Sequence, residues 1–217
     1  METNKKFIGY WNKSVILTYI GIVASIVGSV ALLKNNSLKT ALTCLIIAGI
    51  CDMFDGTVAR MCKRTDNEKE FGVQIDSLAD MICSIAFPLT IFIHSVELNT
   101  NIRQTVNSEV LTIIIASTYA VCGIARLAWF NINTANTEKK VTHYTGLPVT
   151  FIALIFPIIH LIGFVFDLCN LTYYITILIT SILFIGNFKL VKPGKVTYIV
   201  LVILAIISSI AIQFIIK

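Results

Sequence analysis

The chain has 217 residues, of which 56% are hydrophobic and only 13% are charged. Soluble domains carry about 25% charged residues, so this composition excludes an ordinary water-soluble protein and predicts an integral membrane protein. The formal net charge is +5. Its basic residues lie mostly between apolar runs, so we interpret the charge as a signal of membrane orientation and of attraction to anionic lipid, with no nucleic-acid partner.

Seven apolar runs are long enough to cross a bilayer as helices, which takes about 20 residues each. In chain order they cover residues 15–33, 39–61, 72–95, 109–132, 147–167, 171–187 and 196–216. The connections between them are short, so we expect one transmembrane domain over residues 1–217. The predicted fold class is therefore an all-α polytopic membrane protein built as a single helical bundle.

Residues 1–13 precede the first apolar run and mix three lysines with the aromatic residues Phe7, Tyr10 and Trp11. Such a mixture is typical of an interfacial amphipathic segment, and a disordered basic tail is the alternative. The run that follows is too long for a signal peptide and lacks a small-residue cleavage pattern, so we expect a retained first span.

Basic residues are distributed unevenly between the two sides of the predicted bundle. With the amino terminus inside, the cytoplasmic side carries Lys5, Lys6, Lys13, Arg60, Lys63, Arg64, Lys69, Lys139, Lys140, Lys189, Lys192 and Lys195. The other side carries only Lys34, Lys39, Arg103 and Lys217, and Arg126 falls inside a span. By the positive-inside rule, the amino terminus, the loop 62–71 and the segment 133–146 are predicted to be cytoplasmic.

Four aspartates interrupt or border the second and third apolar runs. Asp52 and Asp55 belong to "CDMFDGTVAR" (51–60), and Asp76 and Asp80 to "FGVQIDSLAD" (71–80). Because a helix turns about 100° per residue, Asp52 and Asp55 share one face with Gly56 and Ala59. On the next helix Asp76 and Asp80 share a face with Gly72. Two antiparallel helices can point these faces at each other, near the cytoplasmic end of the bundle.

A nest of carboxylates in an apolar bundle needs compensating positive charge, because each buried Asp is costly and like charges repel. Oxygen-only ligands suit a hard divalent ion such as Mg²⁺ or Mn²⁺, and four carboxylates can share two ions. Neighbouring residues with little or no side chain leave room for a phosphate-bearing ligand. This combination indicates metal-assisted phosphoryl transfer. The alternatives are helix-packing aspartates and a cation-coupled membrane transporter.

The pattern resembles the signature of the CDP-alcohol phosphatidyltransferase family, D-x-x-D-G-x-x-A-R followed by G-x-x-x-D-x-x-x-D. All eight fixed positions are present: Asp52, Asp55, Gly56, Ala59, Arg60, Gly72, Asp76 and Asp80. Within the family the chain is most similar to membrane-embedded phosphatidylserine synthases, through "DSLAD" (76–80), "CGIARLAWFN" (122–131) and "GLPVT" (146–150). The resemblance implies a six-helix core, to which residues 196–216 would be an additional span, and a homodimer.

The resemblance also implies roles for individual residues. Asp52, Asp55, Asp76 and Asp80 would bind two Mg²⁺ or Mn²⁺ ions that hold the pyrophosphate of CDP-diacylglycerol, and Asp80 would be the general base for the acceptor hydroxyl. The CDP-lipid would lie against Gly56, Ala59, Arg60 and Gly72. The hydroxyl of L-serine would attack the lipid-side phosphorus and CMP would leave, on the cytoplasmic face of the cell membrane.

Arg126 is the candidate for binding the acceptor's carboxylate or a phosphate, and a helix-capping or ion-pair role is the alternative. Glycerol 3-phosphate or inositol phosphate is the alternative acceptor, although only Arg60 and Arg126 are expected at that depth. Small residues in the first span, Gly21, Ser25 and Gly28, suit helix packing either within one bundle or between subunits. "GLPVT" is interpreted as the start of the fifth span, with Pro148 in its first turn.

Overall fold

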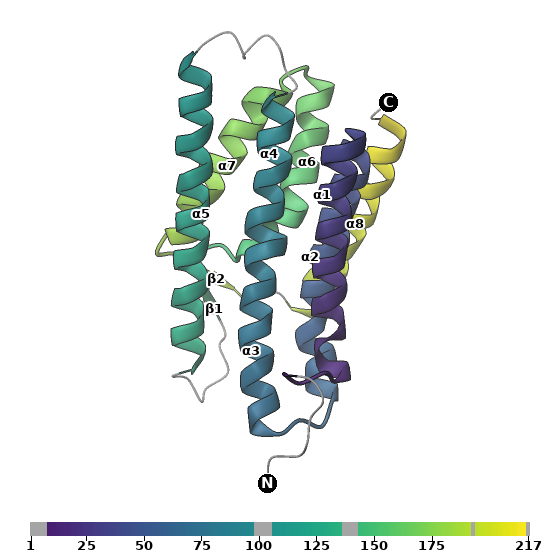
Figure 1. Ribbon diagram of the computed structural model, residues 1–217, viewed down its shortest axis with the longest axis vertical. Helices are drawn as coiled ribbons and strands as arrows, with labels where there is room; N and C mark the ends of the chain where they lie inside the picture. The colour runs from purple at the N-terminus through teal and green to yellow at the C-terminus, as the bar shows by residue number, and fades with distance from the viewer. Residues whose placement is uncertain (1–7, 98–105, 136–142, 192–193, 216–217) are drawn as a thin grey trace.

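A computed structural model describes residues 8–97, 106–135, 143–191 and 194–215. It is an elongated helical bundle (Figure 1). The α-helices are α1 (Ile16–Asn35), α2 (Leu38–Met61), α3 (Asp66–Asp80), α4 (Phe87–Glu97), α5 (Val106–Ala135), α6 (Ile152–Val165), α7 (Cys169–Ile185) and α8 (Lys195–Ile215). A π-helical turn, η2 (Met81–Ala86), joins α3 and α4 into one long helix, and short 3₁₀ turns, η1 (Lys13–Val15) and η3 (Val149–Phe151), precede α1 and α6.

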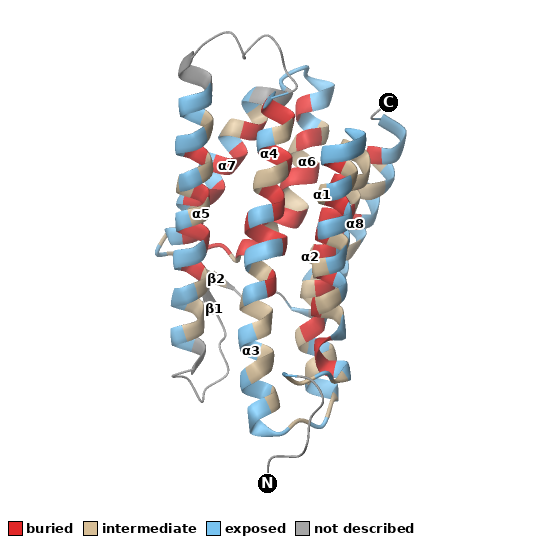
Figure 2. Ribbon diagram, viewed as in Figure 1, coloured by how far each residue is buried: buried red, intermediate tan, exposed pale blue. Residues whose placement is uncertain are grey.

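Five helical stretches are long and apolar enough to cross a membrane: Lys13–Asn35, Leu38–Met61, Asp66–Glu97, Glu109–Asn133 and Val196–Ile215. The expected fifth and sixth spans form the shorter apolar helices Val149–Val165 and Leu171–Ile185. Exposed aliphatic side chains cover the outer faces, while buried residues line the faces that meet inside the bundle (Figure 2). The protein is therefore the all-α membrane protein that the composition predicts.

The third helix begins earlier than its hydropathy suggests. Thr65 caps α3 by accepting a hydrogen bond from the backbone N–H of Glu68, and the Glu68 carboxylate accepts one from the backbone N–H of Thr65 at 2.8 Å. This reciprocal capping box satisfies two helix-terminal donors. Asn12, ahead of α1, also donates to the Glu68 carboxylate at 3.0 Å. The expected loop 62–71 is thus wrong in extent: only residues 62–65 separate α2 from α3.

A two-stranded antiparallel ladder was not predicted by the sequence. Strand β1 (His143–Thr145) pairs with β2 (Lys189–Val191), with Tyr144 opposite Leu190. Gly146 follows with φ of 72°, and a Cβ there would lie 2.8 Å from the carbonyl oxygen of Phe184, so only glycine fits this turn. The ladder fixes the approach to η3, and it replaces part of the loop expected at 133–146.

The small residues of α1 pack within the chain. A Cβ on Gly28 would lie 2.4 Å from Cζ of Phe87 and 2.8 Å from Cβ of Cys44, so α1 sits directly against α2 and α4. Gly21 and Ser25 are buried on the same face. The sequence left open whether these small residues pack within one bundle or between subunits, and the structure shows contacts within one bundle.

Helix α8 packs against α2 and α6 rather than standing apart from the bundle. Its Ala205 and Ile212 are buried, and its outer face is apolar and exposed. At the contact between α2 and α6, a Cβ on Gly49 would lie 2.4 Å from Cβ of Ala153. Helices α2, α6 and α8 therefore form one closely packed wall.

Candidate active site

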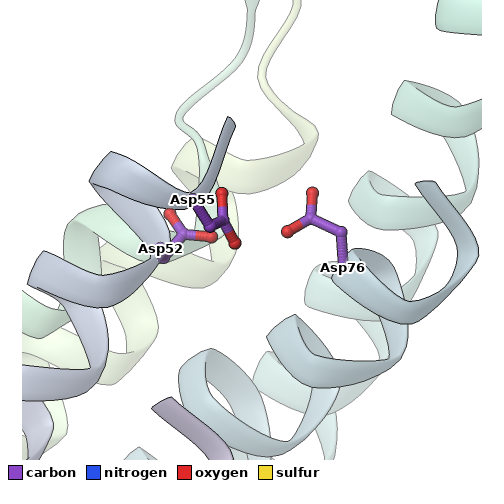
Figure 3. Close-up of side chains that lie close together, drawn as sticks. All are labelled: Asp52, Asp55 and Asp76. Atoms are coloured by element: carbon purple, nitrogen blue, oxygen red, sulfur yellow. The ribbon is translucent and has the colours of Figure 1, made fainter. Parts of the chain in front are cut away.

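Three aspartates from two helices converge near the end of the bundle where α2 turns into α3. One carboxylate oxygen from each of Asp52, Asp55 and Asp76 lies within 4.8 Å of the other two. Figure 3 shows Asp52 and Asp55 on one helix facing Asp76 on the other. The antiparallel arrangement of acidic faces expected from their spacing is present in the structure.

Asp80 lies beside this group rather than in it. Among the described residues the close group consists of the three aspartates above. Asp80, one turn further along α3, lines the same cavity. The four acids thus divide into a compact group of three carboxylates and a neighbouring fourth.

The acids open into a cavity of about 330 Å³, which is the size of a small-ligand site. Its walls come from α2, α3, α5, the η3–α6 segment and α8. The lining residues include Asp52, Asp55, Gly56, Arg60, Asp76, Asp80, Arg126, Phe130, Pro148, Thr150, Tyr198, Leu201 and Ala205. The cavity has a mostly apolar wall with a few convergent charged groups, an arrangement typical of binding sites.

Some of the predicted site residues line the cavity and others do not. Arg126 does so from α5, where it is 7% exposed and its guanidinium lies 5.4 Å from the centre of the Phe130 ring. Arg60 does so from the more exposed end of α2 and donates to the Thr57 hydroxyl at 3.0 Å. Ala59 and Gly72 are not among its lining residues.

The two signature glycines stand in open surroundings. A Cβ on Gly56 would meet only a guanidinium nitrogen of Arg60, at 3.6 Å, and one on Gly72 only that of Arg64, at 3.5 Å. Both are ordinary contacts with the ends of flexible side chains. Helix packing therefore does not require glycine at either position, which leaves room for a ligand as the explanation.

Some residues around the acids were not predicted. The hydroxyl of Thr18, in α1, donates to a carboxylate oxygen of Asp55 at 3.1 Å, and both residues are buried. Thr150 and Asp52 line the same cavity. A lone threonine in an apolar span signals little by itself, and no role in binding was predicted for Thr150, because "GLPVT" was interpreted mainly as a helix start. That helix start is present, with Pro148 immediately ahead of η3, but Pro148 and Thr150 also face the cavity.

Asn131, near the end of α5, also has a contact with the acidic helix. The hydroxyl of Ser77 donates to the side-chain oxygen of Asn131 at 2.8 Å. Ser77 lies between Asp76 and Asp80, so this bond ties the acidic segment of α3 to the helix that carries Arg126.

The chemistry of the donor set suits a divalent cation. Carboxylates this close repel each other, and all the ligand atoms are oxygens, which hard cations prefer. Thr18 donates to Asp55 in the way that outer hydrogen bonds orient ligating carboxylates in metal sites. The group could therefore hold a metal ion.

Comparisons with known proteins agree with this geometry. The family model for CDP-alcohol phosphatidyltransferases matches residues 11–215, which include α8. The archaetidylserine synthase of Methanothermobacter thermautotrophicus is 31% identical over 140 residues, covering 64% of this chain and 54% of that protein. Two proteins named CDP-diacylglycerol–serine O-phosphatidyltransferase also match. The one from Saccharomyces cerevisiae is 31% identical over 131 residues (56% of this chain, 43% of that protein), and the one from Methanocaldococcus jannaschii is 28% identical over 184 residues (83% and 76%). The chain spans about half the length of the first two relatives.

Proposed function

This chain belongs to the CDP-alcohol phosphatidyltransferase family, and we propose that it transfers a phosphatidyl group from CDP-diacylglycerol to the hydroxyl of L-serine, releasing CMP. The observation that carries the proposal is the group of three carboxylates, contributed by both halves of the family signature and open to a cavity inside the bundle. The names of the relatives support serine as the acceptor.

Asp52, Asp55 and Asp76 are the proposed metal ligands, for two Mg²⁺ or Mn²⁺ ions shared with the substrate. The bound ions supply charge neutralisation for the pyrophosphate and make CMP a better leaving group. Thr18 holds one of these carboxylates by its 3.1 Å hydrogen bond to Asp55. The ligand set therefore has its orientation fixed from a third helix.

Asp80 is the proposed general base. Its place beside the three-carboxylate group leaves it available to accept the proton of the serine hydroxyl. The hydroxyl oxygen then forms a bond to the lipid-side phosphorus, and the bond from that phosphorus to the CMP oxygen breaks. The apolar cavity wall limits access of water, which would otherwise compete as the acceptor.

The CDP-lipid is proposed to lie along α2, where Gly56 has no packing partner that demands glycine and Arg60 can bind a phosphate. Ala59 and Gly72 complete the proposed set by their positions in the signature. Neither residue lines the cavity. Their proposed part is to keep α2 and α3 free of bulky side chains beside the entrance for the nucleotide.

Arg126 is the proposed ligand of the serine carboxylate, with an ion pair to one of the acids as the alternative. We expect Arg126→Lys to raise the KM for serine about tenfold or more, because lysine keeps the charge but cannot form the paired hydrogen bonds of a guanidinium. The KM for CDP-diacylglycerol should stay close to that of the wild type. Initial rates of CMP release with each substrate varied in turn measure both constants. A change confined to the KM for CDP-diacylglycerol would assign Arg126 to phosphate instead.

Glycerol 3-phosphate or inositol phosphate would bring a doubly charged group into the cavity. Among the described residues that line it, the basic side chains are Arg60 and Arg126. One of them is proposed for the pyrophosphate, which leaves a single guanidinium, suited to a carboxylate. This balance favours serine over a phosphorylated acceptor.

We also propose that the amino terminus and the cavity face the cytoplasm, in the cell membrane. The start of α1, the α2–α3 connection and the end of α5 lie at one end of the bundle (Figure 1), and the first two of these regions carry Lys13, Arg60, Lys63, Arg64 and Lys69. Residues 1–13 are proposed to lie at the membrane interface, with 1–7 outside the described residues. The homodimer remains a proposal from the family resemblance. A single domain over residues 1–217 remains a proposal from the short connections between the spans.

CMP release by the purified protein in detergent tests the function. CDP-diacylglycerol is supplied with Mn²⁺ or Mg²⁺, and serine, glycerol 3-phosphate and inositol phosphate are tested in parallel. We expect metal-dependent release with serine, abolished by a chelator and restored by added metal. Release with a different acceptor would replace serine in the proposal, and no release with any acceptor would reject transferase activity for this chain.

A further inference from the structure

The long helix that carries Asp76 and Asp80 changes its winding directly after Asp80. Helix α3 ends there, and the next six residues, Met81–Ala86, form the π-helical turn η2. At its end the backbone N–H of Phe87 bonds to the carbonyl of Ile82, five residues earlier. Turns of this kind are rare and occur often at functional sites.

Pro88 removes the α-helical donor for one carbonyl of this turn. Proline has no N–H, so the carbonyl of Ser84, four residues earlier, cannot receive the usual α-helical hydrogen bond. The hydroxyl of Tyr119, in α5, donates to that oxygen at 2.7 Å instead. Ser84 is 3% exposed and Tyr119 is 0% exposed, so no water replaces this bond.

Helix α5 is shaped to approach the π turn. Gly123 lies one turn after Tyr119, and a Cβ there would stand 2.9 Å from Cδ1 of Ile85. The close approach brings the phenol hydroxyl to the Ser84 carbonyl. The position of Tyr119 is therefore fixed by its burial and by the close contact between α5 and η2 at Gly123.

The π turn sets how α3, which carries the acids, is rotated about the helix axis relative to α4, which packs in the core. A π turn holds about one residue more than an α turn, which rotates the following residues by about 100° relative to a continuous α-helix. Above the turn, Phe87, Ile91 and Phe92 are buried in the core. Below it, Asp76 and Asp80 face the cavity.

We propose that Tyr119 is a positioning residue for the carboxylate site: by donating to the Ser84 carbonyl it maintains the π turn that aims Asp76 and Asp80 at the acids of α2. It touches neither the carboxylates nor the cavity, and acts through the backbone of η2. The inference rests on the proposed function only in treating the carboxylate group as a metal site.

Tyr119→Phe tests the proposal, because it removes the hydroxyl and keeps the ring. We expect the Mn²⁺ dissociation constant, measured without substrate by electron paramagnetic resonance, to rise about tenfold. Tyr174→Phe is the matched control: its hydroxyl, in α7, also bonds to another segment, to the hydroxyl of Thr112 in α5 at 2.6 Å, and this bond does not involve η2. It should bind Mn²⁺ as the wild type does.

Pro88→Ala separates positioning from general support of the fold. It restores an N–H for the Ser84 carbonyl and favours an ordinary α-helix, so we expect it to raise the unfolding temperature yet weaken Mn²⁺ binding. Tyr119→Phe should lower both the unfolding temperature and the affinity for Mn²⁺. If Mn²⁺ affinity instead follows the unfolding temperature in both variants, or is unchanged in both, the proposal is overturned. The Mn²⁺ measurement uses no substrate. A failure of the CMP-release assay would therefore reject the proposed function without deciding whether Tyr119 positions the carboxylates.

Discussion

Replacing Asp80 with asparagine is expected to lower the rate of CMP release by about 10²–10⁴-fold, the range for loss of a general base. The amide has nearly the same shape but cannot accept the proton of the serine hydroxyl. Asp80 lies beside the three-carboxylate group rather than within it, so Mn²⁺ binding without substrate should persist. Single-turnover CMP release and an Mn²⁺ titration on the same preparation measure the two properties.

Two further variants in α3 serve as comparisons for Asp80→Asn. Asp76→Asn, inside the carboxylate group, should lose Mn²⁺ affinity together with activity. Asp66→Asn changes a 90% exposed residue that forms a surface ion pair with Lys69, and should resemble the wild type in both assays. Loss of Mn²⁺ binding in Asp80→Asn equal to that in Asp76→Asn would assign Asp80 to the metal instead of the base.

Adding one methyl group at Gly49 is expected to destabilise the protein. In Gly49→Ala the new carbon would lie 2.4 Å from Cβ of Ala153, which is a rigid atom, so α2 and α6 must separate. Overpacking of this kind costs about 1–3 kcal/mol, against a gain of up to about 1 kcal/mol from exchanging glycine for alanine in a helix. The unfolding temperature in detergent should therefore fall.

Gly56→Ala is the matched control on the same helix. Its Cβ would meet only a flexible arginine end at 3.6 Å, so the helix gain should dominate and the unfolding temperature should rise. The double variant Gly49→Ala with Ala153→Gly returns the missing space and should regain most of the lost stability. A fall of equal size for both single variants would mean that backbone flexibility, not the α2–α6 contact, sets the requirement for glycine.

Local spacing was enough to predict the acidic face of each helix. Asp52 and Asp55 are three residues apart and Asp76 and Asp80 four, so their grouping follows from the helical period alone. Hydropathy likewise located the apolar helices of the described residues, with α3, η2 and α4 counted as one. It missed the start of α3, because the charged first turn is held by the capping box of Thr65 and Glu68 rather than by apolar burial.

The remaining parts of the site depend on contacts between distant segments. Thr18 reaches Asp55 across 37 positions in the chain, and Tyr198 enters the cavity from a helix that apolar composition alone marks only as another span. A uniformly apolar helix does not reveal which face meets a neighbour, since lipid and protein interior are equally apolar. The division of the acids into three and one likewise depends on how α2 and α3 lie against each other.

The short capped connection between α2 and α3 bears on how the protein is made. With only residues 62–65 between them, the two acid-bearing helices can pair as a hairpin as soon as both have left the ribosome, because closing so short a loop costs little entropy. The segments that complete the cavity, η3 and α8, follow much later in synthesis. A hairpin of α2 and α3 alone lacks the cavity walls that η3, α6 and α8 supply, so its aspartates are enclosed on fewer sides than in the finished bundle.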